Sequence, residues 1–404
     1  MAQRAPLPGS ALIAIMETTM TDTLQAYSSY FPSALHFGSG CRRLSVEIVD
    51  ALCVPEAPRI FLVCSQSVYG QEPARDLLAA LGPRVVAMRI GVPHDPPLSC
   101  VDEIIAAARV SSANAFLAIG GGSVMDATKT AALLAAAPTP QPAAEYFRGQ
   151  RPLPARSLPL VALPTTAGTG AEITKNAVLT DVEKDNKGSI RSVAMIPAAA
   201  LVDPDFTLAL PAQVTADSGM DALTQALESY VSTGASELSR GLAERAVALL
   251  LRWLPQAYAD GSHAEARLRV AEGSMLTALA FSQSGLGAVH GLAHPIGHVL
   301  NLAHGLTCAV LLPHIMRWNY DCRRDDWSRL ARACGLADGA ALLRAVEALA
   351  TELRVPGNLR GLGLREEHFA YIVRHCRSGS MKANPRAMSD DEVLAMLRVL
   401  AGLG

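Results

Sequence analysis

The stretch AFLAIGGGSVMDATKT, residues 115–130, combines an apolar run, a glycine turn and a helical pattern. Five apolar residues come first, three glycines follow, and a helical pattern begins after them. Such a short apolar run, broken by glycine, suits a strand that is covered on both faces. Glycines let the backbone approach a ligand, and the N–H groups that open the next helix favour a phosphate. We expect a phosphate-binding turn here, although a tight turn without a ligand would look similar.

Further apolar runs occupy 59–65, 84–90 and 158–166, and amphipathic helical patterns at 72–81 and 100–110 lie between them. Strand and helix in alternation are the signature of a parallel sheet with helices on both sides. The Pro-rich segment 137–159 is predicted to be a long loop.

The character of the chain changes after residue 211. Residues 212–280 and 325–402 carry helical periodicity without a run that resembles a strand. We therefore predict a Rossmann-like α/β domain over 31–206 and an all-helical domain over 207–404, with a cleft between them. Residues 1–30 are predicted to be a disordered extension.

Charge, cysteine content and hydrophobicity exclude some classes of function. Among 404 residues, 35 basic and 37 acidic side chains nearly balance, which argues against a nucleic-acid partner. Eight cysteines without a C-x-x-C pair resemble small buried hydrophobes and favour a reducing, cytoplasmic setting. A membrane-spanning helix needs about 20 apolar residues in succession, and we expect none.

A second loop follows the run at 158–166. Thr165, Thr166 and Thr169 lie among small residues there, and their hydroxyls can donate to phosphate or carboxamide oxygens. Ligands of open α/β sheets bind at the carboxyl ends of the strands. Two such loops on consecutive strands therefore indicate a nucleotide site.

Four of the 10 histidines fall within residues 288–305. His290 and His294 share a face if the segment is helical, although Pro295 and Gly297 are expected to interrupt it. We expect His298, in the same segment, and His314, beyond it, to be structural residues with satisfied hydrogen bonds.

In GMDALTQALESY, residues 219–230, Asp221 and Gln225 also share a helix face. Asp221 can join His290 and His304 around a divalent cation. Such a cation would polarise a substrate oxygen and favour the alkoxide that releases hydride. With a nucleotide site across the cleft, this arrangement predicts a dehydrogenase.

Seven motifs carry a family resemblance. In order, the chain resembles the iron-containing (group III) alcohol dehydrogenases at GGGSVMDATK (120–129), PTTAGTGAE (164–172), VDP (202–204), GMDALTQALESYVS (219–232), HGLAHPIG (290–297), HGL (304–306) and SMKANP (380–385). The resemblance runs from about residue 36 to the C-terminus. It implies a dinucleotide-binding domain, a helical metal domain of dehydroquinate synthase-like architecture, and a homodimer or larger homo-oligomer.

By position, the resemblance also implies site residues. The metal ligands would be Asp221, Gln225, His290 and His304, and His294 would lie near the substrate and nicotinamide as a catalytic residue beside Asp221. The residues implied to bind NAD or NADP are Ser65, Gly121, Gly122, Ser123, Asp126, Thr165, Thr166, Thr169, Val178 and Lys187.

Three positions depart from the family pattern. Gln225 stands where many members have a third histidine, and an amide oxygen should bind iron or zinc more weakly than an imidazole. Ser65 stands where NAD-using relatives often have an aspartate that repels a 2′-phosphate, so NADP becomes possible. Asp95 stands at a frequent asparagine of the nucleotide site.

We predict an NAD(P)-dependent alcohol dehydrogenase or aldehyde reductase with a small-molecule substrate. Fe²⁺ is the expected metal, and Zn²⁺ or a metal-free site remain open because of Gln225. The alternatives are a metal-independent enzyme resembling maleylacetate reductase, a non-redox lyase resembling dehydroquinate synthase, and a non-catalytic binding protein.

Overall fold

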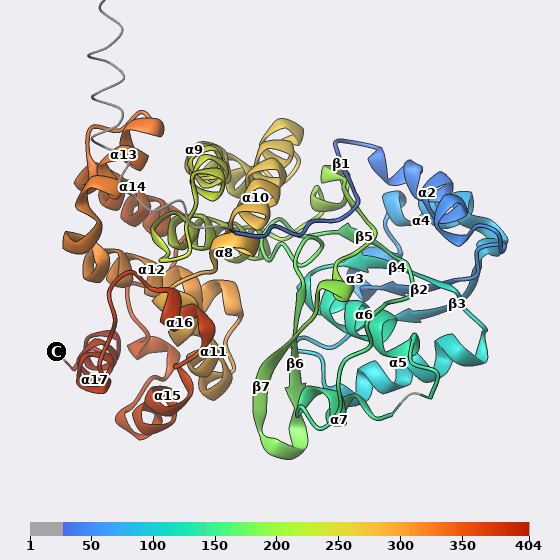
Figure 1. Ribbon diagram of the computed structural model, residues 1–404. Helices are drawn as coiled ribbons and strands as arrows, with labels where there is room; N and C mark the ends of the chain where they lie inside the picture. Colours follow the sequence, from blue (N-terminus) through green and yellow to red (C-terminus); the bar gives the residue numbers. More distant parts are fainter. Residues whose placement is uncertain (1–26, 140, 404) are drawn as a thin grey trace, which may run out of the picture.

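The computed structural model describes residues 27–139 and 141–403 (Figure 1). The first 26 residues of the predicted extension lie outside this part, and residues 27–30 have no regular secondary structure. A sheet flanked by helices forms one half of the molecule and a bundle of helices forms the other. Within the described ranges, no helix combines the length and apolar character needed to cross a membrane.

The sheet has six parallel strands in the order β1-β8-β5-β4-β2-β3. Four of them confirm the strands predicted from the apolar runs. β1 and β8 have four residues each, too short for a recognisable run. The bounds are β1 Ala34–Phe37, β2 Ile60–Cys64, β3 Val85–Ile90, β4 Ala115–Gly120, β5 Leu160–Pro164 and β8 Ala199–Val202.

Two apolar cores sandwich the sheet, because side chains of a strand alternate between its faces. On one face, Phe61 and Phe116 pack against α5 and α6, and on the other, Leu62 and Leu117 pack against α2 and α4. The predicted α/β class is therefore confirmed. The helices of this half are α2 Ser45–Cys53, α3 Gln66–Tyr69, α4 Glu72–Leu81, α5 Leu98–Val110, α6 Gly122–Ala135 and α7 Ala143–Phe147.

A hairpin and a short helix of this half were also not predicted. Strands β6, Asn176–Asp181, and β7, Asn186–Arg191, form an antiparallel hairpin. Its turn reaches the helical half, where Asp185 accepts a hydrogen bond from His298 at 3.1 Å. The prediction of a continuous loop over 137–159 was wrong, because burial of Ala143 and Tyr146 stabilises α7 within it.

The helical half surrounds a third core and begins with α8, ten residues after β8 ends. The prediction that Pro295 and Gly297 interrupt the histidine segment was wrong, since α11 continues to Leu300. Both residues are buried, so packing outweighs the backbone hydrogen bond that proline removes. The helices are α8 Ala212–Val231, α9 Glu237–Ala259, α10 Ala264–Ser284, α11 Ala288–Leu300, α12 His304–Asn319, α13 Arg324–Ala333, α14 Gly339–Glu352, α15 Phe369–His375, α16 Gly379–Ala383 and α17 Asp390–Leu400.

Candidate active site

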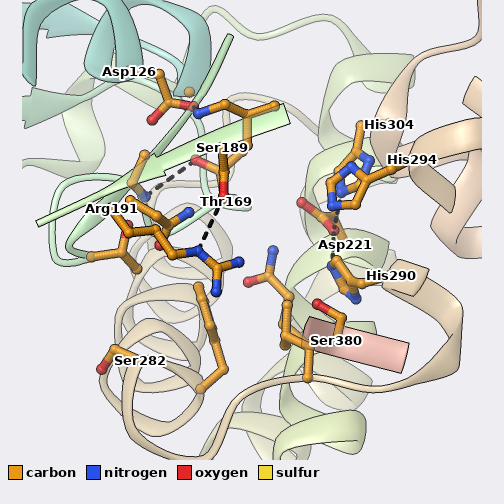
Figure 2. A pocket seen from close by; sticks show the side chains of 18 of the residues that line it. Asp126, Thr169, Ser189, Arg191, Asp221, Ser282, His290, His294, His304 and Ser380 are labelled. Atoms are coloured by element: carbon orange, nitrogen blue, oxygen red, sulfur yellow. Dashed lines mark hydrogen bonds and ion pairs between the residues drawn. The ribbon is translucent and has the colours of Figure 1, made fainter. Parts of the chain in front are cut away.

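A cavity of about 440 Å³ lies between the two halves. Its walls come from the start of α6, the loop after β5, the β6–β7 hairpin and helices α8, α10, α11, α12 and α16. Figure 2 shows Asp221 and three histidines gathered on one side, with Asp126, Ser189 and Arg191 on the other. The residues predicted to hold a cation and several of those predicted to hold a dinucleotide therefore line the same space.

The acidic and imidazole side chains converge from three helices. The Oδ1 atom of Asp221, on α8, lies 3.4 Å from Nε2 of His290, on α11, and 3.8 Å from Nε2 of His304, the first residue of α12. Asp221 and His290 are each only 2% exposed. Cys308, expected from the sequence to be a small buried hydrophobe, belongs to the same cluster, whose four donor atoms lie within 4.8 Å of one another.

Within the described residues, two buried oxygens that line the cavity accept no hydrogen bond: Oδ1 of Asp221, whose nearest imidazole nitrogen is 3.4 Å away, and Oε1 of Gln225. A buried polar atom without a partner costs free energy, so such atoms in a native protein call for an explanation. Carboxylate and imidazole donors around one point, with an amide oxygen in the wall of the same cavity, are donor types that divalent metals use. The residues present therefore fit a divalent cation.

Glu228, which sequence reasoning missed, orients one of the imidazoles. Its Oε2 lies 2.6 Å from Nδ1 of His290, and its Oε1 accepts the backbone N–H of Val289 at 2.6 Å. A carboxylate that holds Nδ1 leaves Nε2 to face the cluster, as is usual behind metal-ligating histidines. The signal was available in the sequence, because Glu228 follows Asp221 and Gln225 at helical spacing on α8.

His294 shares the cavity and stacks on His304, with 5.0 Å between the ring centres. Burial, with His304 and His290 nearby, lowers the pKa of His294 well below its usual range. Burial also lowers the pKa of His304 to about 4, although Asp221 opposes this. Both imidazoles are therefore neutral at pH 7, as a metal ligand or a proton relay must be.

The pKa of His290 moves the other way. Burial lowers it, but Cys308, Glu228 and Asp221 together raise the pKa well above its usual range. The cluster thus favours a positive charge at its centre. A proton on His290 provides one, and a metal ion in its place would provide a larger one.

His298 and His314 stay outside the cavity lining. Besides its bond to Asp185, His298 stacks on Tyr371, and Nε2 of His314 lies 3.0 Å from the carbonyl oxygen of Gly357. Both are satisfied structural residues, as expected.

On the sheet side, Gly121 precedes α6 without a side-chain cap, so the first N–H groups of that helix are open to a ligand. A Cβ atom on Gly122 would lie 2.9 Å from Cγ2 of Thr169, which explains the need for glycine where the two loops meet. Of the predicted dinucleotide residues, the cavity is lined by Gly122, Ser123, Asp126, Thr169, Val178 and Lys187.

Four other predicted residues lie outside this lining, namely Ser65, Gly121, Thr165 and Thr166. Gly121 and Thr166 nevertheless face each other, because a Cβ on Gly121 would lie 3.4 Å from Oγ1 of Thr166. Ser65 follows β2, and its buried hydroxyl lacks a hydrogen-bond partner.

The carboxylate of Asp126 is held by two contacts within the protein. Its Oδ2 accepts the backbone N–H of Val178 at 2.9 Å, and its Oδ1 pairs with the buried ammonium of Lys129 at 3.3 Å. This carboxylate therefore anchors the β6–β7 hairpin to α6.

Asp95, whose consequence was not evident from the sequence, pairs with Lys187 at 2.6 Å. Its backbone is left-handed, with φ of 50°, which aspartate and asparagine tolerate better than most residues. Burial raises the pKa of Asp95, but His94 and Lys187 outweigh this and lower it. An aspartate here thus adds a charge that holds the Lys187 ammonium at the cavity.

The geometry defines a class of protein, in which an α/β half with an open helix N-terminus and a helical half with cation-binding side chains share one cavity. Comparison with known proteins then gives the family. Residues 32–204 match the iron-containing alcohol dehydrogenase model, and residues 215–401 match the C-terminal model of the Fe-containing alcohol dehydrogenase family.

Individual proteins similar to this chain are consistent with these family matches. The chain is 33% identical over 322 residues to 1,3-propanediol dehydrogenase of Klebsiella pneumoniae (78% of this chain, 82% of the relative). It is 37% identical over 290 residues to long-chain-alcohol dehydrogenase 1 of Geobacillus thermodenitrificans (69% and 72%). The solved structure of sulfoacetaldehyde reductase from Bifidobacterium kashiwanohense with NAD⁺ superposes with a TM-score of 0.88 at 30% identity, over 94% of this chain and 100% of that one.

The chain therefore belongs to the iron-containing alcohol dehydrogenase family, and it is an oxidoreductase that acts on alcohols and aldehydes. The maleylacetate reductase-like, lyase and binding-protein alternatives are not favoured.

Proposed function

We propose that this protein transfers hydride between C4 of an NAD(P) nicotinamide and the carbinol carbon of a substrate whose oxygen is held by a divalent metal. One observation carries the proposal: the buried donors Asp221 Oδ1 and Gln225 Oε1, without protein partners, line the same cavity as the open start of α6. Dehydrogenation needs both a hydride acceptor and a group that stabilises the alkoxide, and this cavity offers a place for each.

Asp221, His290 and His304 would hold the metal, and the Gln225 carbonyl oxygen would join them or bind the substrate. Iron or zinc at this point supplies the Lewis acidity that favours the alkoxide. Glu228 keeps the His290 ring in the tautomer that exposes Nε2. His294, neutral and stacked on His304, relays the substrate proton through its ring nitrogens.

The dinucleotide would lie along the sheet edge. Gly121, Gly122 and Ser123 would bind the pyrophosphate at the start of α6, with Asp126 beside that turn. Val178 and the loop of Thr165, Thr166 and Thr169 would lie around the nicotinamide half. Lys187 would contact the nicotinamide ribose. Ser65 bears no charge that would repel a 2′-phosphate, so both NAD and NADP are proposed cofactors.

We further propose that the chain divides into an α/β domain over 31–206 and a helical domain over 207–404, and that it works in the cytoplasm as a homodimer or larger homo-oligomer. All eight cysteines lie in the described ranges and are free thiols, which supports a reducing setting.

Turnover of aldehydes and of maleylacetate, with NADH and NADPH in turn and metal analysis in parallel, tests this proposal against its nearest alternative. We expect aldehyde reduction by protein that contains about one divalent ion per chain. Faster reduction of maleylacetate by metal-free protein would contradict the metal-assisted mechanism.

Glu228→Gln is expected to weaken metal binding about 10- to 100-fold, because the substitution removes the charge that fixes and polarises His290. Competition with a chelator would measure the change. Glu244→Gln, on α9, is the matched control, since Glu244 accepts a hydrogen bond from Tyr230 instead. An unchanged affinity in Glu228→Gln would show that this carboxylate does not support a ligand.

Lys187→Met is expected to raise the KM for the dinucleotide about 10- to 100-fold, because hydrogen bonds from a charged donor contribute roughly 1.5–3 kcal/mol. Metal content should not change. Lys184→Met, in the exposed turn between β6 and β7, provides the comparison. Equal KM values in both variants would remove Lys187 from the cofactor site.

A further inference from the structure

Cys308 lies one helical turn after His304 on α12, so both side chains face α8. The thiol is 0% exposed. Its Sγ lies 3.6 Å from Nε2 of His304 and 3.9 Å from Nε2 of His290. Asp221 on α8 and the pair of His304 and Cys308 on α12 therefore meet at one centre from two helices that pack together.

The separations suit direct coordination. In a tetrahedral zinc site, bonds of about 2.0–2.1 Å to nitrogen or oxygen and about 2.3 Å to sulfur put neighbouring donor atoms roughly 3.3–3.6 Å apart. The Asp221 oxygen and the Cys308 sulfur lie 3.4–3.9 Å from the two imidazole nitrogens. All four donor atoms lie within 4.8 Å of one another, so a contraction of the cluster would bring them into bonding distance of one ion.

A buried cysteine is often only a small apolar side chain. Here, however, its sulfur lies near imidazole nitrogens of the cluster. Within the described residues, two buried oxygens that line the adjoining cavity, Oδ1 of Asp221 and Oε1 of Gln225, accept no hydrogen bond. These unpartnered oxygens are independent evidence that a ligand occupies the centre of the cluster.

We propose that Cys308 is the fourth protein ligand of the metal, in the role that a histidine at position 225 would otherwise have, and that the substrate oxygen binds the ion as a fifth ligand. This inference rests on the proposed metal-assisted function. The ion displaces the thiol proton, which passes to solvent, and no oxidation or reduction is involved. Because thiolate is a soft ligand, the set of one carboxylate, two imidazoles and one thiolate favours zinc over the harder divalent ions.

X-ray absorption spectroscopy of the zinc-loaded protein tests this directly. We expect a sulfur neighbour at about 2.3 Å from zinc in addition to nitrogen and oxygen neighbours at about 2.0–2.1 Å. In Cys308→Ser the sulfur neighbour should disappear, and the zinc affinity should fall at least about tenfold, since changes behind a ligand already cost 10- to 100-fold. Cys376→Ser is the matched control, because Cys376 is equally buried but donates to the carbonyl oxygen of Val373.

The outcomes separate the two proposals. Bound zinc with only nitrogen and oxygen neighbours would overturn the role of Cys308 and leave the metal-assisted function standing. Protein that binds no zinc, iron or cobalt but reduces aldehydes would overturn both. Should Cys308→Ser fail to fold, the spectrum of the unmodified protein still decides, because it requires no variant.

Discussion

Replacing Asp221 with Ala is expected to release the metal and to lower kcat/KM by at least about three orders of magnitude. The Lewis acid contributes several kcal/mol to the transition state, and each 1.36 kcal/mol corresponds to a factor of ten. Among the described ion pairs, Asp221 supplies the only carboxylate within 4 Å of Nε2 of both His290 and His304. The substitution should therefore also remove this shared partner of the two imidazoles. Steady-state kinetics and metal analysis of the same preparation would measure both effects.

Asp217→Ala is the matched control for that variant. Asp217 lies one turn earlier on α8, and its carboxylate accepts a hydrogen bond from Gln213 at 2.8 Å outside the cavity lining. It should retain metal and activity. Equal activity of the two variants would exclude Asp221 from the chemistry.

Gly305→Ala is expected to displace His304 by pushing the first turn of α12 away from α8. A Cβ atom at this position would lie 2.2 Å from the backbone oxygen of Asp217, which cannot turn aside as a side chain can. The first turn of α12 must therefore move away from α8, and His304 moves with it. We expect a loss of about 1–3 kcal/mol in unfolding free energy, as overpacking usually costs, together with weaker metal binding.

Chemical denaturation and chelator competition would measure these two quantities. Gly241→Ala, on α9, serves as the comparison, because a Cβ there meets nothing within 4 Å. Unchanged metal affinity in Gly305→Ala, despite lower stability, would show that the contact between α8 and α12 does not position His304.

The sheet could be predicted because its central strands are continuous apolar runs that end at glycine, serine or proline. The β6–β7 hairpin could not, since its strands mix apolar positions with Lys187, Ser189 and Arg191, which face the cavity. Those polar residues serve the site rather than the core, and they obscure the strand pattern. At Pro295 the sequence predicted a break that does not occur, because tertiary packing of α11 outweighs the local effect of the proline.

The sequence predicted those site residues that are both of a metal-binding or acid–base type and spaced to share a helix face. Asp221, His290, His294 and His304 meet in one cavity as expected. Glu228 and Cys308 were missed although both follow predicted residues at helical spacing. Helical spacing could have suggested both residues, but a glutamate inside an amphipathic helix usually faces solvent and a cysteine in an apolar run usually belongs to the core, so spacing alone was a weak signal.

In the proposed function, a bound divalent metal and a dinucleotide act together on an alcohol or aldehyde. Its most direct test is to remove the metal with a chelator, measure NAD(P)H-dependent aldehyde reduction, and then restore zinc or iron. We predict that activity disappears with the metal and returns with it, while the circular dichroism spectrum stays unchanged. Full activity in protein shown to be metal-free would contradict the account.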